Sequence, residues 1–214
     1  MMNKYVVFDL DDTLYNEIDF LYSAYKEIAN YISPDANLFS KMKEKYHLSE
    51  NVFDWLIAHY PNIEKQTLLK LYREHMPAIS LSQETNEVLN FCKENDYLLG
   101  IITDGRSLTQ RNKIIALGLD SIFQKIIISE EFGSEKPNPE NYKVFMDNEY
   151  DIEKYIYIAD NPRKDFLAPN KLGWDTVCLL DGGRNIHPQN FDQVSSEYLP
   201  KYKIQTISEL KDLL

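Results

Sequence analysis

Basic side chains, cysteines and long apolar runs are all scarce in this chain of 214 residues. It has 23 Lys and Arg residues against 34 Asp and Glu residues, which gives a net charge of −11. Binding to a nucleic-acid backbone needs clustered Lys and Arg, so this composition argues against DNA or RNA as a main partner. It is compatible with a small anionic substrate, because such a ligand requires only local positive charge.

The cysteines and the apolar runs exclude further classes of protein. Cys92 and Cys178 form no Cys-x-x-Cys pair, so neither a thiolate metal site nor a redox site is indicated. No apolar run approaches the roughly 20 residues that span a bilayer. The run Tyr5–Phe8 is too short for the core of a signal peptide. We therefore expect a soluble, cytoplasmic protein with no membrane partner.

Short apolar runs alternate with stretches of helical length. Such runs are typical of parallel strands buried on both faces, and the alternation predicts an α/β fold with a doubly wound, Rossmann-like parallel sheet. Capping boxes at Ser107–Gln110 and Thr206–Glu209 predict two helix starts. The predicted strands are Tyr5–Phe8, Leu98–Ile102, Ile126–Ile128, Tyr155–Ala159 and Thr176–Leu179.

One interval interrupts this alternation. No strand-like run occurs between Leu14 and Leu98, although a single crossover needs only about a dozen residues. Apolar residues there recur every three or four positions, as on the buried face of a helix. We predict an inserted α-helical cap domain over residues 15–80. The core domain then comprises residues 1–14 and 81–214, and its chain returns through a helix at Ser82–Asn95.

Four polar elements each follow a predicted strand. Open α/β sheets bind ligands beyond the carboxyl ends of their strands, so these elements should converge on one site. They are Asp9-Leu10-Asp11-Asp12-Thr13, Thr103-Asp104-Gly105, Lys136-Pro137 and the segment from Asp160 to Asp165.

The charges of these elements indicate a metal and a phosphoryl group. The carboxylates of Asp9, Asp11, Asp160 and Asp165 would repel one another unless a cation lay among them, and oxygen ligands favour Mg²⁺. The ammonium of Lys136 would then complete a pocket for a phosphoryl group. The Thr103 hydroxyl and the backbone N–H groups of the Thr103–Gly105 turn, which include that of Asp104, are further phosphate donors.

The first element also supplies the reacting groups. Asp9 is placed as a carboxylate nucleophile that forms an aspartyl-phosphate. Asp11 is placed to protonate the leaving oxygen and later to deprotonate the attacking water. Tyr15, Asn16 and Glu17 follow this element and are candidates for lining the site.

Together the four elements, in this order and spacing, resemble the motifs of the haloacid dehalogenase superfamily, and the helical insertion resembles the cap of subfamily I. The resemblance implies a Mg²⁺-dependent phosphatase of small nucleotide or sugar phosphates. It implies that Asp9 is the nucleophile and a metal ligand. It also implies that Asp11 is the general acid and base and binds the metal through its backbone carbonyl. Thr103 and Lys136 hold phosphate, and Asp160, supported by Asp165, completes the metal site. Dehalogenating members of the family lack an acid at the place of Asp11, so its presence favours phosphate chemistry. In the fourth motif, Ala159 stands where the family usually has Gly.

Two other functions are compatible with the same residues. A phosphomutase would keep the phosphoryl group on Asp9 and return it to a sugar. A non-catalytic signalling protein phosphorylated on aspartate would also combine acids, a Thr and a Lys, but its reactive Asp follows an interior strand and it has no cap. The sequence carries no signal for the oligomeric state or for the substrate selected by the cap.

Overall fold

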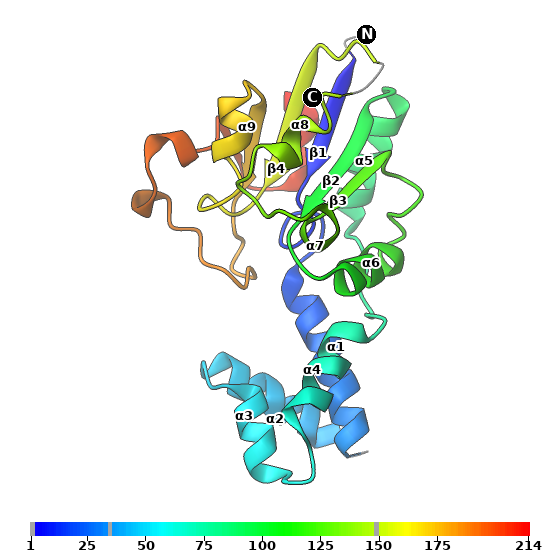
Figure 1. The fold of residues 1–214 in the computed structure, drawn as a ribbon, viewed down its shortest axis with the longest axis vertical. Helices are drawn as coiled ribbons and strands as arrows, with labels where there is room; N and C mark the ends of the chain where they lie inside the picture. The colour runs from blue at the N-terminus through cyan, green and yellow to red at the C-terminus, as the bar shows by residue number, and fades with distance from the viewer. Residues whose placement is uncertain (1–2, 34–35, 148–149) are drawn as a thin grey trace.

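The core of the protein is one parallel sheet of six strands in the order β3-β2-β1-β4-β5-β6. The computed structural model describes residues 3–33, 36–147 and 150–214. Within these residues the neighbouring strands of the sheet run parallel, and helices cover the sheet, so the predicted doubly wound α/β fold is confirmed (Figure 1). The strands are β1 Lys4–Phe8, β2 Leu98–Thr103, β3 Lys125–Ile128, β4 Lys154–Ala159, β5 Asp175–Leu179 and β6 Tyr202–Ile204.

The alternation of side chains along β1 separates two apolar layers. Val6 and Phe8 point into a cluster with α5, α6 and α10, whereas Tyr5 and Val7 point into a second cluster with α8 and α9. All four side chains are buried, as a strand covered on both faces requires. The core helices are α5 Gln83–Glu94, α6 Ser107–Ala116, α7 Ser129–Phe132, α8 Glu140–Lys143, α9 Leu167–Lys171 and α10 Leu210–Leu213, with 3₁₀ turns at Phe191–Gln193, Ser196–Tyr198 and Ile207–Glu209.

Strand β6 was not predicted from the sequence. It has three residues, Tyr202–Ile204, and lies at the edge of the sheet, where it pairs with β5. A strand of this length at the edge of a sheet shows too little periodicity to be recognised. Its presence brings Ile204 into the same apolar cluster as Val6 and Phe8.

Between β1 and α5 the described part of the chain forms four helices. They share an apolar cluster of their own, which includes Ile28, Met42, Leu56 and Leu68, all fully buried. Figure 1 shows them gathered beyond the carboxyl ends of the central strands. The helix that returns to the core, α5, begins after Ser82, whose side chain accepts from Thr85 N. The inserted helices are α1 Glu17–Ile32, α2 Ala36–His47, α3 Val52–His59 and α4 Lys65–Glu74.

One predicted capping box is confirmed and the other is wrong. At Thr206 and Glu209 both side-chain bonds of the box form. At α6 the N-cap is Arg106, one residue earlier than predicted, and the Ser107 hydroxyl donates to Glu131 instead. The side chain of Gln110 donates to Asp11 and Thr103.

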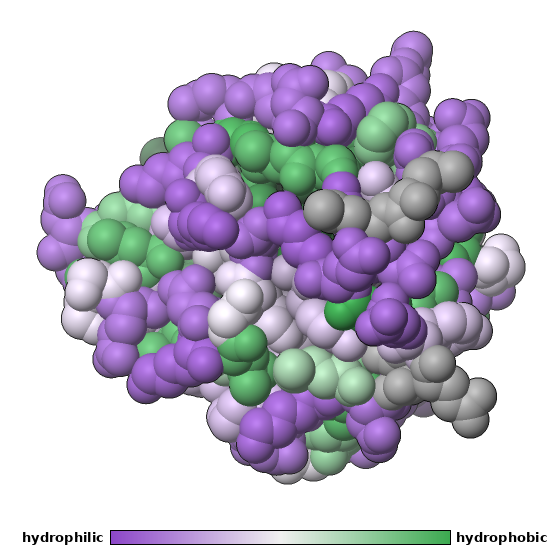
Figure 2. Space-filling model, turned by 90° about the horizontal axis from the view of Figure 1, so that it is seen from above, coloured by the Kyte–Doolittle hydropathy of each residue, from purple (hydrophilic) through white to green (hydrophobic). Residues whose placement is uncertain are grey.

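The end of the molecule opposite the inserted helices is mainly hydrophilic (Figure 2). Figure 2 looks onto the end of the molecule opposite the inserted helices, where hydrophilic side chains predominate and hydrophobic ones form smaller patches between them. Within residues 3–33, 36–147 and 150–214, no helix is both long and apolar enough to cross a membrane.

Gly100 in β2 leaves room for the buried ring of Phe145. A Cβ at this position would overlap with that ring. We expect Gly100→Ala to lower the free energy of unfolding by about 1–3 kcal/mol, which is usual for overpacking a core. Urea unfolding measures this loss, and Gly182→Ala, whose added methyl meets open space, is the control. Equal stability of the two variants would contradict the predicted overlap.

Candidate active site

Three buried carboxylates meet at the carboxyl end of the sheet. Asp9 follows β1 and Asp160 follows the adjacent β4, while Asp165 lies in the turn that leads to α9. One oxygen from each carboxyl group lies within 4.8 Å of the others. The Asp9 side chain accepts from Leu10 N at 2.8 Å, and Asp165 accepts from Asn161 N at 2.9 Å. The parallel direction of β1 and β4 thus brings together acids that lie about 150 positions apart.

The ammonium of Lys136 lies among these acids. Its Nζ atom is 2.9 Å from Asp9 Oδ2 and 2.8 Å from Asp165 Oδ1, and its side chain is fully buried. Burial by itself lowers its pKa, but the carboxylates of Asp165 and Asp9 outweigh burial and raise the pKa of Lys136 well above its ordinary value. The Tyr157 hydroxyl accepts from Nζ at 3.2 Å and donates to Asp165 at 3.3 Å. The carboxylates of Asp9 and Asp165 therefore hold Lys136 between them and favour its charged form.

The carboxyl groups of this cluster lie close enough to disfavour one another's charged forms. Burial, followed by the carboxylates of Asp165 and Asp9, raises the pKa of Asp160 to about 9. Burial also raises the pKa of Asp9 to about 6, although Lys136 lowers it. A buried group of carboxyl oxygens is the donor set that a hard cation prefers, so the cluster is suited to a metal ion.

The carboxylate of Asp11 does not join this cluster. It accepts from the Tyr15 hydroxyl at 2.5 Å, from Lys113 Nζ at 2.7 Å and from Gln110 Nε2 at 2.9 Å. Burial raises its pKa, but Lys113 and the hydrogen bonds outweigh burial, so the pKa of Asp11 is lowered. The expected meeting of four carboxylates is thus wrong for Asp11, because α6 supplies its partners. Ligation through its backbone carbonyl stays a prediction.

The predicted phosphate-binding turn follows β2. Thr103 is buried, and its Oγ1 atom accepts from Gln110 Nε2 at 2.5 Å. The Asp104 carboxylate accepts from Lys136 N at 3.1 Å and lies 3.2 Å from Lys164 Nζ. Gly105 N already donates to Ser129 Oγ at 2.9 Å. The side chain of Asp104 therefore positions two lysines, and phosphate binding by its N–H group stays a prediction.

Sequence reasoning missed several residues that hold the predicted site. Lys113 is buried in α6, where its Nζ is also 3.8 Å from Glu17 and 4.3 Å from the centroid of the Phe20 ring. Asn185, in the loop after β5, donates to Asp160 Oδ2 at 2.9 Å. The spacing of Lys113 and Asn185 from the four motifs does not indicate that they belong to the site. Only the position of Gln110 and Lys113 one turn apart on a helix indicates a shared face.

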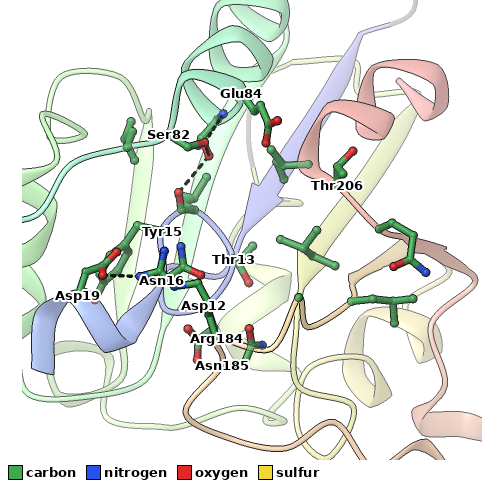
Figure 3. Close-up of a pocket in the computed structure, with 18 of the residues that line it drawn as sticks. Asp12, Thr13, Tyr15, Asn16, Asp19, Ser82, Glu84, Arg184, Asn185 and Thr206 are labelled. Atoms are coloured by element: carbon green, nitrogen blue, oxygen red, sulfur yellow. Dashed lines mark hydrogen bonds and ion pairs between the residues drawn. The ribbon is translucent and has the colours of Figure 1, made fainter. Parts of the chain in front are cut away.

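The loop after β5 also joins the core to the inserted helices. Asp12 accepts from Glu17 N at 2.8 Å and from Ile186 N at 3.0 Å, and Arg184 pairs with Asp19 of α1 at 2.6 Å. Asp12, Asp19 and Arg184 line part of a cavity of about 370 Å³, where Figure 3 shows Asn16 and Asp19 on one side and Arg184 near Asp12. The loop therefore contacts both parts of the molecule beside the acids.

The family model of haloacid dehalogenase-like hydrolases matches residues 6–179. The chain belongs to this family. The match covers all four motifs and the inserted helices, so the family expected from the sequence is confirmed, and the chain is a hydrolase of this type.

Curated relatives along the whole chain are phosphatases. The glyceraldehyde 3-phosphate phosphatase of Methanocaldococcus jannaschii is 28% identical, with 100% of this chain and 97% of that protein covered. The enzyme of the same name from Methanopyrus kandleri is 27% identical over the same shares. The ribulose-1,5-bisphosphate 5-phosphatase of Halopiger xanaduensis is 23% identical, over 65% of this chain and 59% of that protein.

Solved structures agree with the fold. A hydrolase of the superfamily from Bacillus subtilis, YfnB, was solved with bound magnesium and superposes with a TM-score of 0.68 at 19% identity. The alignment covers 100% of this chain and 99% of that one. A phosphatase of the superfamily from Thermococcus onnurineus gives a TM-score of 0.61 at 18% identity, over 98% of this chain and 97% of the other.

Proposed function

We propose that this protein is a Mg²⁺-dependent phosphatase that hydrolyses the monoester of a small sugar phosphate through an aspartyl-phosphate on Asp9. The observation that carries the proposal is the group of Asp9, Asp160 and Asp165 around the ammonium of Lys136. A carboxylate beside a cation, at the edge of a sheet where ligands bind, is suited to attack on phosphorus.

The acid cluster fits a magnesium ion. Asp9, Asp160 and Asp165 would hold it, together with the backbone carbonyl of Asp11. The bound ion would neutralise charge on the acids and on the phosphoryl oxygens. Asn185 would keep Asp160 oriented towards it, because its amide already donates to the second oxygen of that carboxylate.

Each side chain of the proposed site has a separate role in the reaction. Asp9 attacks phosphorus while the bond to the leaving oxygen breaks, and Asp11, in the form of the enzyme that carries it protonated, gives that oxygen its proton. Water then attacks the aspartyl-phosphate, Asp11 takes the proton of the water, and orthophosphate leaves. Lys136 and the Thr103 hydroxyl stabilise the phosphoryl oxygens in both steps.

The inserted helices set which substrates can enter. We place the boundary of a cap domain at residues 15–80, with the core at 1–14 and 81–214. Such a cap closes over a small substrate and excludes bulk water. The curated relatives that match the whole chain are named for glyceraldehyde 3-phosphate, which makes a triose phosphate the first substrate to test.

We expect the purified chain to release orthophosphate from glyceraldehyde 3-phosphate in the presence of Mg²⁺. Chelation by EDTA should lower the rate at least about 100-fold, because the acids then repel the incoming phosphoryl group. Added Mg²⁺ should restore the rate and raise the midpoint of thermal unfolding, since a ligand that binds only the folded state stabilises it.

The same assay separates the alternative functions. Orthophosphate released in proportion to the substrate consumed excludes a phosphomutase. A stable phosphoenzyme without turnover would instead contradict the phosphatase and favour a signalling protein. Full activity in EDTA, with no effect of Mg²⁺ on unfolding, would contradict the metal site alone.

A further inference from the structure

Gln110 of α6 connects two groups of the predicted active site. Its Nε2 atom lies 2.9 Å from Asp11 Oδ2 and 2.5 Å from Thr103 Oγ1. The residue is buried, although it belongs to none of the four motifs. One amide nitrogen therefore contacts both the proposed acid/base and a proposed phosphate ligand.

The contact with Asp11 fixes the orientation of the amide. An amide nitrogen can only donate hydrogen bonds, and Nε2 of Gln110 is the atom that faces both Asp11 Oδ2 and Thr103 Oγ1. The other oxygen of Asp11 accepts from Lys113 Nζ at 2.7 Å. Both N–H bonds of Gln110 are then used, one towards Asp11 and one towards Thr103.

This orientation has a consequence for Thr103. A hydroxyl that accepts from an N–H group keeps its own hydrogen for another partner. Thr103 therefore does not have to donate to Gln110, and its hydrogen can be directed to a phosphoryl oxygen. With the amide reversed, Thr103 would donate to Gln110 and lose this function.

The backbone at Gly105 leaves space for the side chain of Gln110. Gly105 has φ +146°, and a Cβ there would lie 3.2 Å from Cδ and Cγ of Gln110. That distance is tighter than ordinary van der Waals contact. The turn after β2 thus requires a glycine partly because Gln110 packs against it.

We propose that Gln110 is a positioning residue that holds Asp11 in place for proton transfer and sets the donor direction of the Thr103 hydroxyl. The inference rests on the proposed phosphatase function. It predicts a loss that depends on the leaving group, because a basic alkoxide needs the proton of Asp11 far more than a weakly basic phenolate does.

The test compares two substrates in Gln110→Met. For an alkyl phosphate such as glycerol 3-phosphate, kcat/KM, which reports the transfer of the phosphoryl group to Asp9, should fall about 100-fold, the lower range for loss of general acid–base catalysis. For p-nitrophenyl phosphate, kcat/KM should fall less than about tenfold. The Gln110→Glu side chain has the same shape, but its ionised carboxylate can only accept hydrogen bonds. In this variant too, the loss should be larger for the alkyl phosphate than for p-nitrophenyl phosphate.

Two controls separate positioning from a structural role. Asn112→Ala removes the bonds from α6 to the carbonyls of Glu74 and His75 without touching Asp11, so any loss should be equal for both substrates. Thermal unfolding checks that each variant is folded. Equal losses for both substrates in Gln110→Met and Gln110→Glu, or no loss, would overturn the role of Gln110 alone. Absence of hydrolysis by the unaltered chain would instead contradict the proposed function as well.

Discussion

Replacement of Asp9 by asparagine should remove essentially all phosphatase activity while the fold is kept. Asparagine has nearly the same size, and its amide oxygen can still accept from Leu10 N, as Asp9 does at 2.8 Å. It cannot attack phosphorus to form an acyl phosphate, because a neutral amide oxygen is a poor nucleophile. We expect kcat to fall by at least about 10⁴-fold, since the chemical step itself is lost.

The measurement is orthophosphate release with Mg²⁺ and glyceraldehyde 3-phosphate. Asp120→Asn, at an exposed position after α6, is the matched control and should keep full activity. Mass spectrometry of protein quenched during turnover should find a phosphorylated species in the unaltered chain and none in Asp9→Asn. Full activity of Asp9→Asn would contradict the assignment of the nucleophile and of the aspartyl-phosphate.

Replacement of Lys136 by methionine should lower both the free energy of unfolding and the phosphatase activity. The side chain is fully buried and pairs with Asp9 and Asp165 at 2.9 and 2.8 Å. Its removal leaves two buried carboxylates without their cation, and such a loss typically lowers the free energy of unfolding by about 3–5 kcal/mol. Methionine fills a similar volume, so the loss reports on charge more than on packing.

Urea unfolding without Mg²⁺ measures this loss. Added Mg²⁺ should recover part of it, because a cation among the acids replaces part of the missing charge. Lys164→Met is the control. Its ammonium lies at the rim, with 36% of the side chain exposed, and its pair with Asp104 should contribute at most about 1 kcal/mol. Equal losses in the two variants would show that Lys136 is not the charge that holds the acids.

Several features of the site were predictable because they depend on the direction of strands. Asp9 and Asp160 both follow apolar runs, and parallel strands place their carboxyl ends at one edge. Lys136 was placed in the same site by its order among the motifs. Residue types at these positions also indicated the chemistry, since clustered acids need a cation.

The orientation of single side chains was not predictable in the same way. Asp11 shares its element with Asp9, but its carboxylate turns to Lys113 and Gln110, about 100 positions further along the chain. The capping box at Gln110 was a reasonable prediction from spacing. It is wrong because α6 begins one residue earlier and because the amide finds buried partners outside its helix.

The sequence by itself determined the parallel sheet, the helical insertion and the set of acids with one lysine at the strand ends. These follow from apolar periodicity and from residue order, which are local properties of the chain. Only the tertiary structure decided where the carboxylate of Asp11 points, that Gln110 joins it to Thr103, and that Asn185 holds Asp160. Contacts of this kind depend on how helices and loops pack across long separations, and no local pattern encodes that packing.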